Sequence, residues 1–432
     1  MLRNSMTSPE KPLKPRKFAA PRGTADILPD DWPYWKYVRD TAERVCELFG
    51  YLRIETPIFE HAGVFLRTSG ESSDIVSKEV YVFEDRGQDL LALRPEGTAN
   101  VMRAYIEHGM ASLPQPVRLF YIGPNFRYDR PQAGRYRQHT QLGIEAVGDP
   151  DALVDAEVIE LLATFYRELG LSEFTIKLNT IGDQVCRPGY IEALRAYYRP
   201  LLPTVCDDCR MRFEKNPLRL LDCKEARCQA SIAGAPQLRD YLCEPCKEHF
   251  AKLTGYLDAL DIAYVIDERL VRGLDYYTRT VFEFHPHEEG SQSSMGSGGR
   301  YDGLVELLGG SPTPGVGFGT GFERLIINIK RQGADVPPAP GPALYIAHLT
   351  PEASLAAVRL ARAVRAAGRQ VILGAAGRSL KAQMRHADAK AAAYAAIIGA
   401  DELAAGEVTL RNLGDHSERR VRLADVAAAL AD

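Results

Sequence analysis

The chain reads Phe126-Arg-Tyr-Asp-Arg-Pro-Gln-Ala-Gly-Arg-Tyr-Arg-Gln138 between two apolar segments, residues 118–122 and 142–147. Pro and Gly near the middle of this stretch favour a turn, so the two segments predict an antiparallel hairpin. Its loop carries three arginines, Arg130, Arg135 and Arg137. Guanidinium groups crowded on one loop repel one another unless an anion lies among them, and their planar fork suits phosphate. Taken alone, the stretch also fits a solvated basic loop.

A second segment, Gly315-Val-Gly-Phe-Gly-Thr-Gly-Phe-Glu-Arg324, has a glycine at every second position. Alternate residues of a strand face the same side, so this spacing predicts a strand with one flat, bare face, followed by a helix with Arg324 in its first turns. A flat face suits a stacked planar ring. No Gly-Lys-Ser/Thr follows, which excludes a Walker loop, and the spacing differs from the dinucleotide-binding fingerprint. Glycine-rich strands can also serve packing alone.

Two more segments combine glycine, arginine and tyrosine. Leu270-Val-Arg-Gly-Leu-Asp-Tyr-Tyr-Thr278 leads into a predicted strand at residues 280–284, and Gly298-Gly-Arg-Tyr-Asp-Gly303 is predicted to form a glycine-rich turn. The glycine that follows Arg272 permits close approach of a ligand, and the tyrosine hydroxyls can donate or accept hydrogen bonds.

The length and composition point to a soluble protein of several domains. A chain of 432 residues exceeds one hydrophobic core, so two or three domains are expected. No apolar run approaches the ~18 residues of a membrane span. The first 17 residues mix Pro, Lys, Arg and Ser without an apolar stretch, which predicts a disordered tail rather than a secretory signal. We therefore expect a cytoplasmic protein without a membrane partner.

The C-terminal region has a regular pattern. Residues 333–342 are rich in Pro and Gly and read as a linker. Strands are predicted at residues 343–347, 370–373 and 394–398, with helices at 351–367 and 379–391. This alternation predicts a small α/β domain with a largely parallel sheet. From Gly341 onward, 12 Lys and Arg face 9 Asp and Glu in a chain of net charge -4, so the basic surface lies here.

Near the N-terminus, a helical pattern from Trp32 to Phe49 ends at Gly50, and a strand-like run, residues 52–56, ends at Pro57. A long helix that leads into an edge strand fits a dimer-forming unit. An ordinary surface helix fits equally well.

The region from about residue 184 to 260 reads as short helices inserted between two strand-like runs, residues 174–178 and 264–266. It contains three closely spaced cysteine pairs, Cys206/Cys209, Cys223/Cys228 and Cys243/Cys246. Such spacing suits zinc, and disulfides are rare in cytosolic proteins. We predict that Cys206, Cys209, Cys243 and Cys246 are the candidate ligands of one structural Zn²⁺, although six cysteines exceed four ligands. Cys46 and Cys186 are expected to be plain buried residues.

Together these segments resemble a known family. Residues 126–137 resemble the second signature motif of class II aminoacyl-tRNA synthetases, residues 315–324 the third, and the helix and strand ending at Pro57 the first. Residues 272–278 and 298–304 resemble the two histidine-specific motifs of histidyl-tRNA synthetases, and residues 22–29 and 94–98 also resemble that family. The resemblance covers the chain beyond the tail in the expected order.

The resemblance implies an α+β fold. A class II catalytic domain would occupy residues 18–330, on an antiparallel sheet flanked by helices, with the helical insertion at about 184–260. A disordered tail would precede it over residues 1–17. A linker at 331–342 would lead to a C-terminal α/β anticodon-binding domain at 343–432.

The resemblance also implies an activity and the residues that perform it. The enzyme would activate L-histidine with ATP and Mg²⁺, transfer it to tRNA(His), and work as a homodimer. Arg127 and Arg272 would be catalytic, on either side of the ATP α-phosphate. ATP would be bound by Arg127, Arg135, Arg272, Arg324 and Gly319. Histidine would be bound by Glu96, Gly97, Thr98, Gln141, Glu145, Tyr276, Tyr277 and Tyr301. The tRNA acceptor end would meet Arg130 and Gln132.

Two other interpretations fit parts of the sequence. A non-catalytic relative, the regulatory subunit of ATP phosphoribosyltransferase, usually lacks the C-terminal domain and degrades the Arg-Gly-Leu-Asp-Tyr-Tyr motif, whereas this chain retains both. A zinc-bearing nucleic-acid-binding protein without enzymatic activity would explain the cysteines and the basic C-terminus but not the four Arg/Gly segments.

Overall fold

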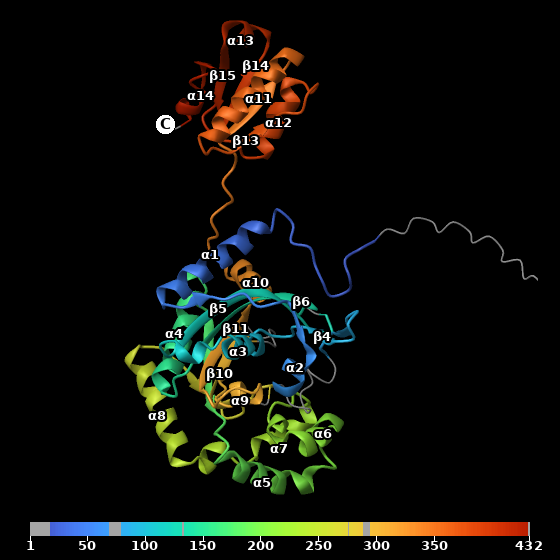
Figure 1. Cartoon of the computed structure of the whole chain (residues 1–432), viewed down its shortest axis with the longest axis vertical. Coiled ribbons are helices and arrows are strands. Elements are labelled where there is room, and N and C mark those ends of the chain that lie inside the picture. The colour runs from blue at the N-terminus through green and yellow to red at the C-terminus, as the bar shows by residue number, and fades with distance from the viewer. Residues whose placement is uncertain (1–17, 69–78, 132–133, 275, 288–293, 431–432) are drawn as a thin grey trace, which may run out of the picture. The chain divides into compact units, whose positions relative to one another are not determined.

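The computed structural model describes residues 18–68, 79–131, 134–274, 276–287 and 294–430 (Figure 1). The chain divides into two compact units, one up to Val336 and one from Pro337 onward. The predicted tail, residues 1–17, lies outside the described residues.

The first unit is built on an eight-stranded sheet with the order β1-β5-β6-β11-β10-β9-β7-β8. The central pairings are antiparallel, and only the edge strands β1 and β8 pair in parallel. The strands are β1 (Leu52–Arg53), β5 (Val117–Phe126), β6 (Gln138–Val147), β7 (Phe174–Thr180), β8 (Val265–Ile266), β9 (Thr278–Pro286), β10 (Gly296–Arg300) and β11 (Gly315–Gly321). A small sheet beside it has the order β2-β4-β3 and consists of β2 (Phe59–His61), β3 (Val82–Glu84) and β4 (Leu90–Leu93).

Helices cover both faces of the large sheet, and Figure 1 shows α1 and α10 on one side of it and α2 and α3 on the other. The helices of this unit are α1 (Trp32–Leu48), α2 (Ala62–Thr68), α3 (Thr98–Glu107), α4 (Ala152–Glu168), α5 (Arg187–Tyr198), α6 (Asp207–Lys215), α7 (Ala226–Ala233), α8 (Glu244–Ala259), α9 (Leu304–Leu307) and α10 (Phe322–Gln332). The largest core joins α1, α4, α8 and α10 to one face of the sheet, and a second core joins α3 and α9 to the other.

The alternation along β6 shows how the strands position a polar site above an apolar core. Leu142, Ile144 and Ala146 are buried in the largest core. Gln141 and Glu145 point to the opposite face because successive side chains of a strand alternate. The face that carries them is the one covered by α3 and α9.

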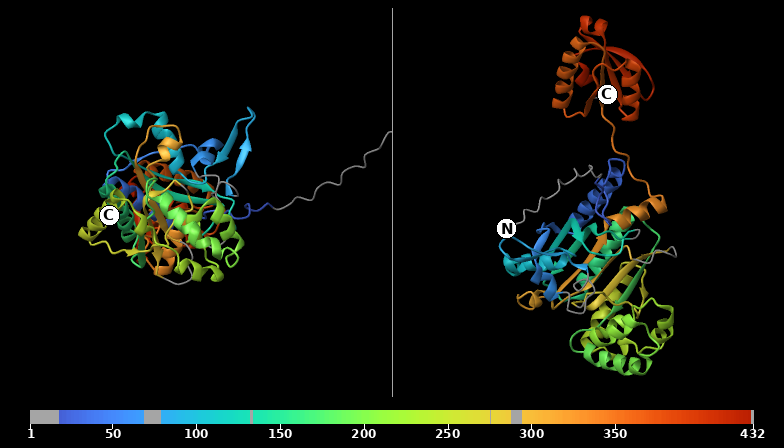
Figure 2. Two further views of the ribbon diagram at one scale, coloured as in Figure 1. Left: turned by 90° about the horizontal axis from the view of Figure 1, so that it is seen from below. Right: turned by 90° about the vertical axis from the view of Figure 1, so that its right-hand side faces the viewer.

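Helices α5, α6 and α7 form a separate helical lobe, drawn in green in Figures 1 and 2. This lobe has its own core, which includes six buried cysteines with Cys243 packed against it, and its helices lie between β7 and β8 in the sequence. The last helix between those strands, α8, places Leu253 and Leu257 in the largest core instead. It therefore anchors the insertion to the sheet.

Three elements differ from their predicted form. The segment predicted as a glycine-rich turn begins within strand β10, because β9 and β11 on either side supply backbone partners. The hairpin strands β5 and β6 extend further toward the loop than predicted. Strand β1 is shorter than residues 52–56: it ends at Arg53, and the carbonyl of Thr56 accepts a hydrogen bond from the side chain of Arg94 (3.2 Å).

The second unit has a five-stranded sheet with the order β13-β12-β14-β15-β16. Its elements are β12 (Leu344–His348), α11 (Pro351–Ala366), β13 (Val371–Leu373), α12 (Leu380–Ala389), β14 (Tyr394–Ile398), α13 (Ala400–Ala405), β15 (Glu407–Asn412), β16 (Glu418–Arg422) and α14 (Val426–Ala429). The three predicted strands are parallel neighbours, but β15 and β16 add antiparallel pairings that the sequence did not predict. Strand β16 is mostly exposed and charged, so it lacks an apolar pattern.

In the first unit, helix α10 continues to Gln332, two residues into the predicted linker.

Candidate active site

One face of the large sheet carries rows of residues that lie side by side across five strands. The register pairs each residue with its neighbour on the next strand, and residues two apart on a strand share a face. One row is Glu283, Ser297, Gly319, Gly143 and Tyr121, and the next is Val281, Gly299, Gly317, Glu145 and Leu119. The glycines of both rows lie in the middle strands, so this face is bare at its centre and lined with side chains at its edges.

The glycines are required by close neighbours. A Cβ on Gly319 would overlap the side-chain amide of Gln141, and a Cβ on Gly317 would overlap the Ile144 carbonyl and the Glu145 carboxylate. A Cβ on Gly143 would overlap the ring of Tyr121. The bare strand therefore gives room to the polar groups beside it.

Glu145 is the most deeply buried acid of this face. The hydroxyl of Tyr301 donates a hydrogen bond to its Oε2, while its Oε1 has no partner among the described residues. Burial raises the pKa of the Glu145 carboxyl to about 8, although the hydrogen bond from Tyr301 acts in the opposite direction. The tyrosine rings of Tyr276, Tyr277 and Tyr301 pack around it, with the centroids of Tyr276 and Tyr277 4.8 Å apart. The result is a buried, aromatic pocket with one free carboxylate oxygen.

A second acid, Glu96, lies at the start of α3. Its carboxylate accepts the backbone N–H groups of Thr98 (2.7 Å) and Ala99 (3.0 Å). Burial raises the pKa of the Glu96 carboxyl, and these two hydrogen bonds and the charge of Arg127 oppose that shift. Nearby, Gln141 accepts a hydrogen bond from Asn125 at 2.5 Å.

Several cations gather at the end of the hairpin. Nε of Arg127 donates to the carbonyl of Pro95 (2.8 Å), and Arg324 donates to the carbonyl of Gly134 (2.9 Å). Burial lowers the pKa of Arg324, and repulsion by Arg135 and Arg127 adds to this effect. Burial and the charges of Arg127 and Arg324 lower the pKa of His139 to about 3. So much mutual repulsion indicates a site that favours an anion.

Arg272 lies at the opposite edge of the bare face. It donates to Glu283 (2.5 Å) and to the hydroxyl of Ser297 (2.9 Å), and its guanidinium lies 5.2 Å from the ring centroid of Tyr277. Burial alone would lower the pKa of Arg272, but Tyr277 and Glu283 outweigh it and raise the pKa. This cation is fully charged and held in a fixed orientation.

The two arginines thus lie at opposite sides of the bare face. Arg272 contacts Ser297 on β10, while Arg127 follows β5 and acts electrostatically on His139 of β6. Strand β11, with Gly319 on the bare face, lies between β10 and β6. Two strand spacings make the floor about 10 Å wide.

Comparisons with known proteins place the chain in a family. A family model described as histidyl-tRNA synthetase matches residues 23–183 and 225–325, and one described as an anticodon binding domain matches residues 343–432. The histidine–tRNA ligase of a Dehalococcoides mccartyi strain is 52% identical over 406 residues, which are 94% of this chain and 97% of that protein. The chain belongs to the histidyl-tRNA synthetase family.

Other members of the family are similar in sequence and in structure. The histidine–tRNA ligase of Moorella thermoacetica is 49% identical, covering 94% of this chain and 96% of that protein. The crystal structure of apo histidyl-tRNA synthetase from S. aureus has a TM-score of 0.82 and 35% identity, and the match covers 96% of this chain and 100% of that one. The predicted α+β class, with a catalytic domain and a C-terminal anticodon-binding domain, is confirmed.

The family fixes the activity. This synthetase activates histidine with ATP and transfers it to tRNA, which makes it a ligase as predicted. The two other interpretations, a regulatory subunit and a non-enzymatic nucleic-acid-binding protein, are therefore wrong.

In the part of the chain that the structure describes, no helix is both long and apolar enough to cross a bilayer.

The structure gathers most of the predicted site residues on the bare face. The exceptions belong to the hairpin loop, where Arg130 and Arg135 are exposed and Gln132 lies outside the described residues. Nη1 of Arg135 lies 3.3 Å from the carboxylate of Asp129. The sequence reasoning did not single out Tyr121, His139, Glu283 or Ser297. The hairpin register could have found Tyr121, since it pairs with Gly143, two residues before Glu145.

The cysteines of the synthetase form two groups rather than one. Cys206, Cys209, Cys223 and Cys228 make one group, and Asp183, Cys186, Cys243 and Cys246 make the other. The predicted set of Cys206, Cys209, Cys243 and Cys246 is therefore wrong, because its two pairs lie in different groups. Cys186 is buried as expected but belongs to the second group. Sequence spacing identifies a pair but not the partner pair, which depends on how the lobe folds.

Proposed function

We propose that histidine reacts with the α-phosphate of ATP over the bare face, between Arg127 and Arg272. The observation that carries this proposal is the bare floor at Gly319 with one guanidinium on each side. Phosphate oxygens gain charge as the substrates react, and fixed cations stabilise that charge without reorganising. Such preorganised groups contribute several kcal/mol, on the order of 3 kcal/mol for each donor.

The proposed reaction needs no nucleophile from the protein. A carboxylate oxygen of histidine attacks the α-phosphorus and forms a new P–O bond, and the bond to the β-phosphate oxygen breaks. Pyrophosphate leaves with that electron pair, and histidyl-adenylate remains. In the second step, a ribose hydroxyl of the tRNA attacks the activated carbonyl, and AMP leaves.

We propose that Arg135 and Arg324 bind the distal phosphates. Family members use ATP with Mg²⁺, which would neutralise part of the charge of the distal phosphates when it is bound. Oxygen donors suit this ion, and Oε2 of the neighbouring Glu323 has no partner among the described residues. The repulsion within the arginine group supports the assignment, because bound phosphates relieve it.

Histidine is proposed to lie with its ring in the tyrosine pocket. The free Oε1 of Glu145 would accept an imidazole N–H, and Tyr277 and Tyr301 would enclose the ring, with Tyr276 packed behind them. The α-amino group would lie near Glu96, Gly97, Thr98 and Gln141. A wrong side chain would leave Glu145 buried and unpaired, which a polar pocket penalises strongly.

We further propose that Arg130 and Gln132 meet the acceptor end of tRNA(His), and that the unit from Pro337 binds the anticodon. Exposure of Arg130 at the end of the hairpin supports the first part. The second rests on the match to the anticodon-binding family model. Because tRNA is charged in the cytoplasm, we place the synthetase there.

A homodimer is proposed through α1 and β1. Apolar side chains are exposed on and beside these elements, among them Trp32 (48%), Leu48 (71%), Leu52 (70%) and Phe59 (54%). Sedimentation velocity is expected to give twice the chain mass, and Leu52→Glu is expected to give a monomer. A monomeric parent protein would contradict the proposal.

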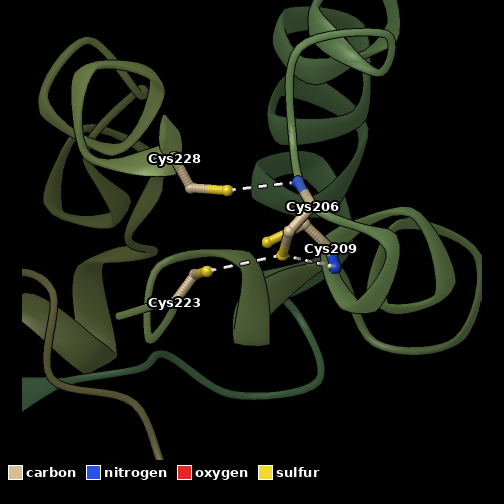
Figure 3. A group of neighbouring side chains, drawn as sticks. All are labelled: Cys206, Cys209, Cys223 and Cys228. Atoms are coloured by element: carbon tan, nitrogen blue, oxygen red, sulfur yellow. Dashed lines mark hydrogen bonds between the residues drawn. The ribbon is translucent and has the colours of Figure 1, made fainter. Parts of the chain in front are cut away.

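A structural zinc ion is proposed in the insertion, held by Cys206, Cys209, Cys223 and Cys228. Figure 3 shows the four side chains converging from separate segments, with the sulfur atoms of Cys206 and Cys223 3.7 Å apart. Tetrahedral Zn–S bonds of 2.3 Å require sulfur atoms ~3.8 Å apart. Backbone N–H groups of Cys209 and Cys206 point at the sulfur atoms of Cys206 and Cys228, as thiolate ligands require.

Pyrophosphate exchange into ATP, measured with each amino acid in turn, tests the proposed site. We expect exchange with histidine alone and loss of exchange in Arg127→Gln. Exchange by Arg127→Gln at the parent rate would contradict the placement of the reacting phosphate.

A further inference from the structure

A second cluster of metal-ligating side chains lies where the insertion joins the catalytic sheet. Asp183 follows β7, and Cys186 precedes the first residue of α5; Cys243 and Cys246 lie at the start of α8. The ligand atoms of all four residues lie within 4.8 Å of one another. These positions are where the chain enters the helical lobe and where it returns to the sheet.

The spacing of these atoms fits a tetrahedral ion. The sulfur atoms of Cys186 and Cys246 are 3.8 Å apart, and Asp183 Oδ1 lies 3.5 Å from the sulfur of Cys186 and 3.8 Å from that of Cys243. Zinc bonds of 2.3 Å to sulfur and 2.0 Å to oxygen require ~3.8 Å between two sulfur atoms and ~3.5 Å between sulfur and oxygen. A disulfide would need sulfur atoms ~2.05 Å apart.

We propose that Asp183, Cys186, Cys243 and Cys246 bind a structural Zn²⁺ that fastens both ends of the insertion to the wall of the histidine pocket. Four protein ligands fill a tetrahedral shell and leave no open position, which is the pattern of a structural rather than a catalytic zinc. This site is separate from the four-cysteine group inside the lobe.

Nearby groups balance the charge of such a centre. Three thiolates and one carboxylate around Zn²⁺ leave a net charge of about -2. Arg279 lies 3.5 Å from Asp183 Oδ2, and the backbone N–H of Asp183 points at the sulfur of Cys186 (3.3 Å). Partners of this kind orient the ligands of a metal and stabilise their ionised forms.

The zinc site would fix a series of contacts that leads from Cys186 to the histidine pocket. Arg187, the first residue of α5, is next to Cys186 and donates to the carbonyl of Tyr277 (2.7 Å) and to that of Gly182 (3.0 Å). Tyr277 in turn lies beneath the guanidinium of Arg272. A metal that fixes the start of α5 therefore fixes Arg187 and, through it, Tyr277. This makes the four ligands and Arg187 positioning residues.

By joining the two ends of the insertion, the bound ion would close a long loop of the chain and so stabilise the fold. The sequence places Cys246 60 residues after Cys186, and cross-linking so long a loop removes conformational freedom from the unfolded chain. The alternative is a set of reduced thiols packed in the lobe core, which holds the insertion by apolar contacts alone.

Zinc content per chain, measured by elemental analysis of protein purified under reducing conditions without chelators, separates these cases. We expect two ions in the parent protein, and one fewer in Cys246→Ser and in Cys223→Ser, which probe the two groups separately. Cys46→Ala, a buried cysteine outside both groups, is the matched control and is expected to keep both ions. Unchanged zinc in Cys246→Ser overturns the proposal.

A measurement on the parent protein covers the case in which Cys246→Ser does not fold. Cys243 is partly exposed, so a soluble alkylating reagent reaches it unless a metal occupies its sulfur. We expect at least tenfold faster alkylation of Cys243 after a strong zinc chelator is added, and equal rates overturn the proposal. In Cys246→Ser, hydrogen exchange is expected to rise at residues 181–187 and 277–280, and the KM for histidine to rise more than kcat falls. Zinc content and alkylation do not depend on activity, so failure here is distinguishable from failure of the proposed catalytic site.

Discussion

Substitution of Glu145 tests how the synthetase selects histidine. Its carboxylate is fully enclosed, with Oε2 bonded to Tyr301 and Oε1 without a partner among the described residues. If Oε1 accepts an imidazole N–H, Glu145→Gln replaces a charged acceptor with a neutral amide. Hydrogen bonds to charged groups contribute ~1.5–3 kcal/mol, so kcat/KM for histidine should fall roughly 10- to 100-fold. Glu145→Ala should abolish measurable histidine-dependent exchange, since it also removes the partner of Tyr301.

The pH dependence sharpens this prediction. The pKa of Glu145 in the free protein is raised to about 8 by burial, so its carboxyl is protonated below that pH. Binding that requires the ionised form must then release this proton. At pH 7 the cost is about 1.4 kcal/mol, or tenfold in affinity. The advantage of the parent protein over Glu145→Gln should therefore grow about fivefold from pH 7 to 8 and about twofold more by pH 9, where the carboxyl is almost fully ionised.

The assay is pyrophosphate exchange at varied histidine concentration between pH 6.5 and 9. Glu157→Gln is the matched control, because Glu157 pairs with Arg118 (2.8 Å) away from the site. Arg118 shares its face of β5 with Phe120 and Ile122, which belong to the core on the opposite side of the sheet. Its kcat/KM is expected to equal that of the parent at every pH. A Glu145→Gln enzyme within threefold of the parent across this range would refute the assigned role.

Three further substitutions test other parts of the site. Gly317→Ala should lower activity at least 100-fold and reduce the melting temperature, because the added Cβ meets a backbone carbonyl. Gly321→Ala is the control and should keep the parent melting temperature, because its Cβ meets nothing closer than 4.0 Å. Equal melting temperatures for the two variants would contradict this reasoning. Arg300→Ala removes the arginine partner of the fully buried Asp155, which keeps a hydrogen bond from Thr280 (2.5 Å) and His249 at 3.4 Å. The catalytic unit should lose about 3 kcal/mol of stability in urea, followed by tryptophan fluorescence because both tryptophans lie in α1; a loss below ~1 kcal/mol would show that the pair is not important. Arg272→Lys cannot reproduce the two-armed contact with Glu283 and Ser297, so kcat for exchange should fall about 100-fold; retention of half the parent kcat would argue against a charge-stabilising role.

The sequence predicted local chemistry well. The Arg-rich hairpin, the strand of alternating glycines and the helix that begins just before Arg324 all appear where their patterns placed them. Each depends on neighbours within about ten residues, where strand alternation, turn residues and helix-starting signals act directly. The family resemblance supplied the order of the segments and the substrate.

Groupings between distant segments were harder to predict. The cysteine pairs were visible, but the sequence joined Cys206 and Cys209 to the wrong partner pair. The contribution of Asp183 was not anticipated, because an isolated aspartate before a helix has no spacing pattern. Strand β16 was missed because its exposed, charged residues carry no apolar period. Strand β15 was missed although Val408 and Leu410 alternate with polar residues and are buried.

The amino-acid sequence by itself determined which positions are glycine, charged or aromatic. It also determined which of them share a face of their own strand, because the strand period of two is a local property of the backbone. Only the tertiary structure decided which strands lie side by side and in what register, and hence that Glu283, Ser297, Gly319 and Tyr121 form one row. Register across the sheet and the closure of a long inserted loop depend on packing between segments far apart in the chain. No local pattern encodes those contacts, since their free energy is gained only when the whole core forms.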